Sequence, residues 1–481
     1  MFWRGVLGYL PVNIVQGVVG LLTLVVFTRL LDPAQFGAYA LGFSAMSLVH
    51  TAAFTWNEAA MARLWAAETD SERRAHHVAT IHHTWLGLLG VLPPLAIGAG
   101  LWPMDGDAKA AVLAGLLAVA PRSYVRLVQE RQRAAGEVAG AASLDIAMTV
   151  GGFAAGALFA WMGLGGAAPL LGFAVAGFAC AAWRAPTERA VRGGGRFDVT
   201  RVRPHAAYGV PVAASLILSL IMSSTDRFLL AAFLDADAVG VYHAGYSLAN
   251  RTLDVVFVWL GAAGAPALIM ALERGGKPAL HAAALEQSGL MLLLTLPAAA
   301  GLALVSQPLS ELMLGPALAA RAGQVTPWIA ASGLLAGFTT YYFHQAFTLG
   351  RRTPALLLAM AVPAIANVVL NLVLIPRMGL QGALVATLAS YGLGLAASAA
   401  LGRSVIALPI PWRVLAEAIV ATGLMALAVA ALPDLGGLSE LALKAAAGVA
   451  VYGAVILLLD AGGLRTRCLD LVRARRLEPA A

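Results

Sequence analysis

The chain has 481 residues, of which 60% are hydrophobic and only 12% are charged, and its mean hydropathy is +0.80. Soluble domains carry about 25% charged residues, so this chain has too few polar groups to cover a globular surface. Apolar runs long enough to cross a hydrocarbon layer, roughly 20 residues each, recur from end to end. The composition therefore excludes a soluble domain and indicates an all-α polytopic membrane protein.

Apolar stretches separated by proline, glycine or charge predict about fourteen transmembrane helices. In chain order they cover about 5–29, 36–61, 78–101, 109–130, 138–162, 167–183, 206–232, 239–261, 285–306, 325–349, 354–375, 381–402, 413–432 and 439–461. The first stretch is interpreted as a retained helix, because Asn13 and Gln16 interrupt it and no small-x-small cleavage site follows, as a signal peptide would need.

The basic residues alternate between the two predicted sides of the membrane. Lys and Arg number 25 in the even-numbered loops and the termini, and five in the odd-numbered loops. Since cytoplasmic loops carry an excess of Lys and Arg, both termini are predicted to be cytoplasmic. The same placement accounts for the net charge of +7, so no nucleic-acid partner is expected.

The basic segment 184–205, "RAPTERAVRGGGRFDVTRVRPH", is predicted to be a flexible cytoplasmic linker. It divides the chain into an N-terminal six-helix bundle (1–183) and a C-terminal six-helix bundle (206–402). Residues 403–481 are expected to add helices 13 and 14 and a basic cytoplasmic tail. That tail is interpreted either as an interfacial helix on the anionic leaflet or as a solvated segment. Cys180 and Cys468 lie far apart in different predicted compartments, so nothing suggests a disulfide framework or a metal site.

Two stretches repeat each other at a spacing of 203 residues. When residues 31–60 are placed over 234–263, ten positions are identical, among them an aspartate, two glycines, a tyrosine, a phenylalanine and a tryptophan. Both stretches fall in the external hairpin between the first two helices of a bundle, where Asp and Gly are turn residues. Because 203 residues contain an even number of helices, the bundles are predicted to be parallel repeats, a class that occurs in secondary transporters.

These stretches also carry a family resemblance. "RLLDPAQFGAYAL" resembles the Arg-x-Leu-x-Pro-x-x-Phe-Gly-x-Tyr motif of the polysaccharide biosynthesis membrane proteins, the Wzx-type oligosaccharide flippases of the MATE/MOP-like superfamily. "TDRFLLAAFLDADAVGVY" is similar to the motif in the second half of that family, and "AFTLGRRTP" fits its helix-end pattern.

The resemblance implies that an undecaprenyl-pyrophosphate-linked oligosaccharide moves from the cytoplasmic to the periplasmic leaflet, for exopolysaccharide, O-antigen or capsule assembly. It implies alternating access around a cavity lined by the first, second, seventh and eighth helices. No bond is made or broken, so no enzyme activity and no cofactor are expected; coupling to a proton or sodium gradient is the expected energy source. Membrane lipids and other polysaccharide assembly proteins are the candidate partners.

Ionisable residues inside predicted helices are candidates for the cavity, because each costs roughly 2.5–3.5 kcal/mol to insert. In the second bundle these are Asp226, Arg227, Arg251 and Asp254, with the two arginines as anion-binding groups. A structural ion-pair cluster that locks the two helices together is the alternative. His344 is a further candidate, as a titrating group within the tenth helix.

Counterparts in the first bundle are Asn13, Gln16, Asn57 and Glu58. Glu58 is either a coupling-ion site or an interfacial carboxylate at a helix end. Trp56 and Trp259, matched by the repeat, either stack on sugar rings or anchor their helices at the interface.

The end of the fourth helix places Arg122, Arg126, Gln129 and Arg133 along one stripe. The arginines are interpreted either as a cytoplasmic mouth that captures pyrophosphate or as ordinary positive-inside residues.

Three other functions remain open. An ion-coupled multidrug exporter of the same fold would favour a cavity rich in acids. A lipid II flippase would favour more cationic residues in the first helix, where only Arg29 occurs near the outer end. A membrane-embedded glycan polymerase or ligase would need large external loops, and the largest candidate here is 307–324.

Overall fold

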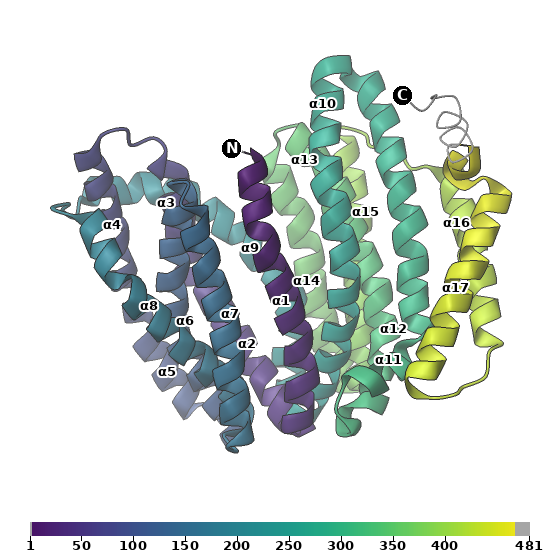
Figure 1. Cartoon of the computed structure of the whole chain (residues 1–481), viewed down its shortest axis with the longest axis horizontal. Helices are drawn as coiled ribbons and strands as arrows, with labels where there is room; N and C mark the ends of the chain where they lie inside the picture. Colours follow the sequence, from purple (N-terminus) through teal and green to yellow (C-terminus); the bar gives the residue numbers. More distant parts are fainter. Residues whose placement is uncertain (1, 467–481) are drawn as a thin grey trace, which may run out of the picture. The chain divides into compact units, whose positions relative to one another are not determined.

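The computed structural model describes residues 2–466, and this part of the chain is helical without a strand. Residues 467–481, which include Cys468 and most of the expected basic tail, lie outside the described region. Contacts within the chain define two compact units, unit 1 (Met1–His243) and unit 2 (Ala244–Ala481). Figure 1 labels the helices of both.

Unit 1 is built on α6, which packs against α2, α3 and α8, while α7 packs on both α8 and α1. Its elements are α1 (Phe2–Leu30), α2 (Pro33–Ala53), α3 (Thr55–Trp65), α4 (Ser71–Leu88), η1 (Leu89–Val91), α5 (Leu92–Leu101), α6 (Gly106–Ala134), α7 (Val138–Trp161), η2 (Gly165–Ala167), α8 (Ala168–Arg192), α9 (Val199–Phe233) and the start of α10 (Ala236–Leu304).

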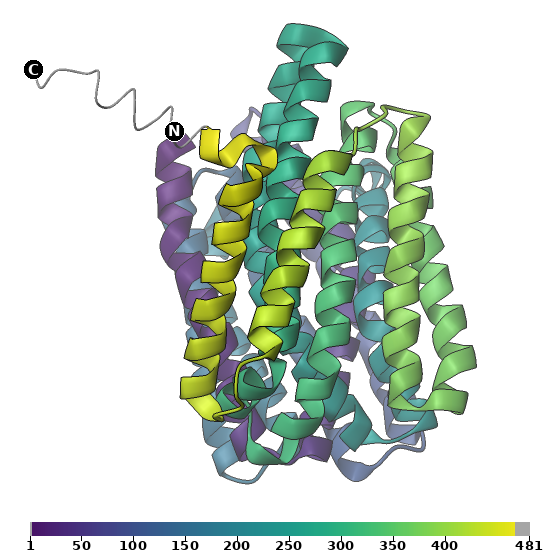
Figure 2. The same ribbon diagram turned by 90° about the vertical axis from the view of Figure 1, so that its right-hand side faces the viewer.

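Unit 2 contains the helical pairs α14–α15 and α16–α17, and the second pair is seen face-on in Figure 2. After α10 its elements are α11 (Ser306–Met313), α12 (Pro316–Phe338), η3 (Thr339–Phe343, a π-helical turn), α13 (Gln345–Leu349), α14 (Thr353–Met378), α15 (Leu380–Arg403), α16 (Trp412–Ala430), α17 (Gly437–Leu459) and η4 (Ala461–Gly463).

Eleven helices in the described part of the chain are long and apolar enough to cross a membrane. One of them, α10, is two helices joined at Gly276, whose φ of 64° and ψ of −158° interrupt the helical backbone. Glycine adopts this conformation without a Cβ clash, so it suits the turn between two helices. The α2–α3 and α12–α13 segments also run the length of a span. The fold thus agrees with about fourteen transmembrane helices.

The predicted linker 184–205 is mostly helical. Helix α8 continues to Arg192 and α9 begins at Val199, so six residues, 193–198, form the connection. Asp198 caps α9 by accepting hydrogen bonds from the Thr200 hydroxyl at 2.6 Å and the Thr200 amide at 3.0 Å. These bonds hold the pKa of Asp198 below its usual value. The capped start of α9 explains why the loop is shorter than the glycine-rich, basic composition of residues 184–205 predicts.

The two repeated hairpins touch each other. Asp32 caps α2 through a capping box with Gln35, and Asp235 caps α10 by accepting from the Ala238 amide at 2.8 Å. A Cβ built on Gly37 would lie 1.8 Å from the carbonyl oxygen of Ala236, and one on Gly240 would lie 2.0 Å from that of Pro33. The repeat-matched glycines therefore allow two helix backbones to meet, as hairpins on the same side of the membrane require.

Gly37→Ala is expected to destabilise the protein by about 1–3 kcal/mol, because the new methyl group meets a backbone carbonyl that cannot rotate away. Denaturant unfolding of purified protein measures the effect. Gly423→Ala in α16 is the matched control, since a Cβ there meets nothing within 4 Å. A helical Gly→Ala change at such a site is expected to stabilise by about 0.5–1 kcal/mol. Equal effects of the two substitutions would show that the close approach is unimportant.

Candidate functional site

Buried polar residues gather inside unit 1 at the break between α2 and α3, where Phe54 separates His50 from Glu58. His50 Nε2 lies 2.8 Å from Glu58 Oε1, and their side chains are 6% and 9% exposed. Next to Glu58, the buried Asn57 donates from Nδ2 to the Ile81 carbonyl oxygen of α4 at 3.1 Å. The predicted carboxylate site therefore lies inside a helix bundle, with a histidine as its neighbour.

Arg122 of α6 faces this pair. It lies within electrostatic reach of Glu58 and of Arg126, one turn further along α6, and its guanidinium sits 5.6 Å from the Phe173 ring centre. The buried Nε of Arg122 has no hydrogen-bond partner among the described residues. Neither Arg122 nor Arg126 has a carboxylate within ion-pairing distance in residues 2–466.

The position of these arginines along α6 sets their depth. At 1.5 Å per residue from Gly106, Arg122 lies about 24 Å and Arg126 about 30 Å along the helix. A hydrocarbon layer is about 30 Å thick, so a layer that starts at Gly106 encloses Arg122 and ends near Arg126. Two like charges one turn apart repel each other by a few tenths of a kcal/mol. The pair is thus suited to an anion that enters from one side of the membrane.

The other arginines of α6 are neutralised by nearby carboxylates. Arg133 pairs with Glu130 at 2.6 Å and with Asp145 at 2.9 Å, and Gln129 donates to the other oxygen of Asp145 at 2.9 Å. Arg131, whose side chain is 1% exposed, pairs with the buried Glu188 at 2.8 Å and with Glu137 at 3.0 Å. Arg133 therefore differs from Arg122 and Arg126, with which it shares the predicted stripe.

Asp226 and Arg227 of α9 are both buried, and each contacts the beginning of α10. The Tyr242 hydroxyl donates to Asp226 Oδ2 at 2.5 Å, while Arg227 Nε donates to His243 Nδ1 at 3.2 Å and Arg227 also donates to the Ser223 carbonyl. The His243 ring in turn lies 5.4 Å from that of Phe36 in α2. These contacts join the second hairpin to α2.

The remaining candidates are dispersed. Asn13 and Gln16 lie exposed on α1, and Trp56 is half-buried at the start of α3. Arg251, Asp254 and Trp259 are exposed on α10, where Asn250 Nδ2 donates to Asp254 Oδ2 at 2.7 Å. His344 follows the π-helical turn η3, and its buried Nε2 has no partner in the described part of the chain.

Arg131 and His82 are not among the candidates that the sequence predicts. Arg131 was counted as one more basic residue of a cytoplasmic loop, although the acidic Glu188 within the basic segment 184–205 was a signal that a partner existed. His82 lines a cavity described below, and nothing in "IHH" at 81–83 distinguishes it from its neighbours.

The helical arrangement and the number of apolar spans define a polytopic helical membrane protein, with buried ionisable groups inside unit 1. Residues 2–272, more than half of the chain, match the family described as Polysaccharide biosynthesis protein. The chain belongs to this family, which confirms the resemblance of its hairpin motifs. A comparison with curated protein sequences finds no match.

Solved structures with a similar fold include a flippase and two multidrug transporters. One is a lipid II flippase MurJ in an inward closed conformation, with a TM-score of 0.73 and 13% identity over 93% of this chain and 98% of that one. Another is an inward-facing multidrug resistance MATE family transporter of the MOP superfamily, with a TM-score of 0.62 and 15% identity over 81% and 94%. An outward-facing MATE family transporter gives 0.52 and 16% over 84% and 93%. At these identities the likeness establishes the fold.

Proposed function

We propose that the protein is a flippase that moves an undecaprenyl-pyrophosphate-linked oligosaccharide from the cytoplasmic to the periplasmic leaflet of the bacterial inner membrane. Membership of the polysaccharide biosynthesis family supports the process in which it acts. The fold, shared with a lipid II flippase, supports the kind of movement. Such a movement makes and breaks no covalent bond, so it requires binding groups rather than a nucleophile or a general base.

The physical problem is the diphosphate. An unpaired anion in hydrocarbon is prohibitively costly, whereas the prenyl tail can stay in lipid. The protein must therefore present cationic groups below the membrane surface without pairing them to its own carboxylates. Arg122 and Arg126 meet this requirement among the described residues of unit 1, and they are the single observation that carries the proposal. Arginine also matches phosphate oxygens with two parallel N–H donors.

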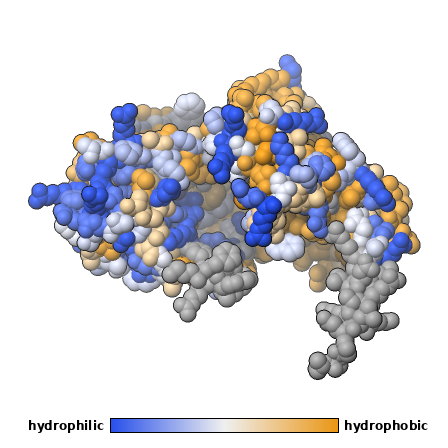
Figure 3. All heavy atoms as spheres, turned by 90° about the horizontal axis from the view of Figure 1, so that it is seen from above, coloured by the Kyte–Doolittle hydropathy of each residue, from blue (hydrophilic) through white to orange (hydrophobic). Residues whose placement is uncertain are grey.

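The proposal also includes the orientation of the protein in the membrane and the ion gradient that drives transport. Both termini are proposed to lie in the cytoplasm, which the distribution of basic residues supports. Figure 3 shows hydrophilic residues gathered over the end of unit 1 at which α3 ends and α4 begins, and this end carries the exposed Arg63 and Arg73. His50 and Glu58, paired inside the bundle, are the groups proposed to exchange a proton or a sodium ion during transport. In unit 2, the exposed Arg251 of α10 is proposed as an anion-binding group.

Reconstitution tests this function. Purified protein in liposomes is given a fluorescent undecaprenyl-diphosphate oligosaccharide in one leaflet, and a membrane-impermeant quencher reports its arrival in the other. We expect movement above that of protein-free liposomes, and a change in its rate when a proton or sodium gradient is imposed.

Two parallel substrates distinguish the alternatives. If fluorescent lipid II moves as fast as the oligosaccharide lipid, the substrate range would extend to any polyprenyl-diphosphate glycan. Accumulation of a cationic dye without movement of either lipid would overturn the proposal in favour of a multidrug exporter. In cells, wild-type protein is expected to restore polysaccharide export in a strain that lacks its own flippase.

A further inference from the structure

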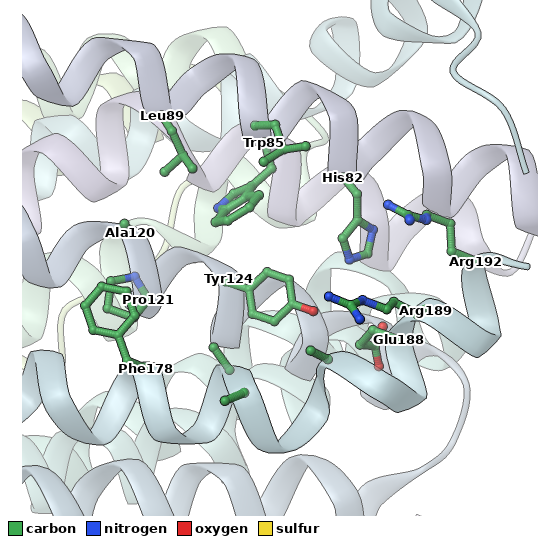
Figure 4. A pocket seen from close by; sticks show the side chains of 14 residues that line it. His82, Trp85, Leu89, Ala120, Pro121, Tyr124, Phe178, Glu188, Arg189 and Arg192 are labelled. Carbon is green, nitrogen blue, oxygen red and sulfur yellow. The ribbon is translucent and has the colours of Figure 1, made fainter.

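A cavity of about 570 Å³ lies within unit 1 between α4, α6 and α8. Its walls combine two kinds of residue, as Figure 4 shows. Trp85, Leu89 and Phe178 line one end, whereas His82, Arg189 and Arg192 stand together at the other. Volumes of about 300–1,000 Å³ are typical of small-molecule sites.

This cavity is separate from the arginine pair of the proposed transport site. Tyr124, which contributes to the cavity wall, is two residues from both Arg122 and Arg126 on α6. Successive residues of a helix turn by about 100°, so Tyr124 projects from the opposite face of α6. The arginine pair and the cavity therefore lie on opposite sides of α6.

The polar end of the cavity carries positive charge that the protein does not neutralise. Glu188 also lines this end of the cavity, but its carboxylate is bound to Arg131 at 2.8 Å. Within residues 2–466, neither Arg189 nor Arg192 has a carboxylate partner at ion-pairing distance. Both lie in the last turn of α8. An anionic group bound there would supply the missing counter-charge.

His82 adds a second, independent indication of a ligand. It is 7% exposed, and its Nδ1 lies 2.8 Å from the Val78 carbonyl oxygen, to which it must donate. The buried Nε2 has no partner among the described residues. When Nδ1 holds the proton of a neutral ring, Nε2 is an acceptor. A hydroxyl group beside the anion would satisfy it.

The other end of the cavity is apolar and open towards the lipid-facing surface. Leu86 is 52% exposed and Phe178 is 48% exposed. The most apolar window of the Ser71–Leu101 segment has none of its residues buried. His82 of α4 and Leu89 at the start of η1 are seven residues apart, which is about 10 Å along the helix. The cavity thus has a cationic end and an apolar end at the spacing of an amphiphile's headgroup and upper chain.

We propose that this cavity binds an anionic phospholipid with a hydroxylated headgroup, such as phosphatidylglycerol. The phosphate contacts Arg189 and Arg192, and a headgroup hydroxyl donates to His82 Nε2. One acyl chain lies along Trp85, Leu86 and Leu89 against Phe178. The lipid is a bound component of unit 1 and is distinct from the glycan-carrying lipid that is transported.

Lipid binding to the full-length protein tests the proposal. Purified protein in detergent is titrated with phosphatidylglycerol, phosphatidic acid and phosphatidylcholine, and native mass spectrometry measures the bound fraction. We expect phosphatidylglycerol to bind at least 10-fold more tightly than phosphatidylcholine. The double variant Arg189→Gln/Arg192→Gln should lose roughly 10- to 30-fold in affinity for phosphatidylglycerol, which is the factor expected for two arginine–headgroup contacts.

Two controls decide the result. Arg63→Gln/Arg73→Gln removes the same charge from exposed positions of unit 1 and should leave the affinity unchanged; an equal loss would show that only surface charge matters and would overturn the proposal. Wild-type protein is expected to prefer phosphatidylglycerol to phosphatidic acid, and His82→Leu should abolish this preference while leaving anion binding intact; a preference that survives the substitution would contradict the hydroxyl contact. An undecaprenyl diphosphate that displaces phosphatidylglycerol and is lost in the Arg189→Gln/Arg192→Gln variant would overturn it in favour of the carrier lipid. Thermal unfolding of each variant confirms that it is folded.

Discussion

Replacing Arg122 and Arg126 together by glutamine is expected to slow transport of the lipid-linked oligosaccharide by at least 100-fold. Each arginine offers charge-assisted hydrogen bonds to the diphosphate, and a hydrogen bond to a charged group is worth about 1.5–3 kcal/mol. Every 1.4 kcal/mol is a factor of ten. The rate is measured with the fluorescent oligosaccharide lipid in liposomes.

The same variant should keep or gain stability. Removing two like charges one turn apart relieves a repulsion of a few tenths of a kcal/mol, and the desolvation cost of burying the Arg122 charge, which the substitution removes, offsets its lost attraction to Glu58. Unfolding in denaturant should therefore give a free energy equal to or above that of the wild type. Loss of activity together with loss of stability would show that the pair is structural. Arg63→Gln/Arg73→Gln, which removes equal charge from the exposed end of unit 1, should transport at the wild-type rate.

Replacing Arg131, in contrast, is expected to lower stability. Arg131→Met should lower the free energy of unfolding by about 3–5 kcal/mol, because Glu188, whose side chain is 2% exposed, would be left buried without its counter-charge. Arg131 contacts both Glu188 oxygens and also binds Glu137, so it joins α6 to α8 and to the start of α7. Denaturant unfolding measures the loss.

A double substitution separates charge from packing. Arg131→Met/Glu188→Met removes both buried charges and should recover most of the lost stability, since buried ion pairs often contribute no more than well-packed apolar residues. Glu137→Gln should cost less than about 1 kcal/mol, because the Glu137 side chain is 48% exposed and water screens its pair. A double variant as unstable as Arg131→Met would contradict this account of the cluster.

The contrast between Arg122 and Arg131 shows what sequence can and cannot predict. Both occur in the same basic stretch of α6, and positive-inside placement explains both equally well. Arg131 is neutralised by Glu188, which is 57 residues away in the sequence. Nothing local to α6 distinguishes an arginine with a distant carboxylate partner from one without it. The pairing becomes visible only when α6 and α8 are packed together.

The repeated hairpins, unlike the arginine pairing, could be predicted from the sequence. The ten identities between residues 31–60 and 234–263 predicted two hairpins on the same side of the membrane, and the glycines of those hairpins are in contact in unit 1. This prediction succeeded because a duplication is visible as identical residues at a fixed spacing, and because a turn depends on a few neighbouring residues. The break at Phe54 was not predicted, since no proline or glycine marks it.

The sequence by itself determined the membrane class, the approximate number of helices, the repeat and the family. These follow from apolar length, charge alternation and short motifs, each of which depends on residues close together in the chain. The tertiary structure decided which buried charges are neutralised, where α2 and α3 are interrupted, and that three helices enclose a cavity with His82 at its polar end. Such features arise from contacts between helices, and the energy of a buried charge depends on groups that only the fold brings within a few ångströms.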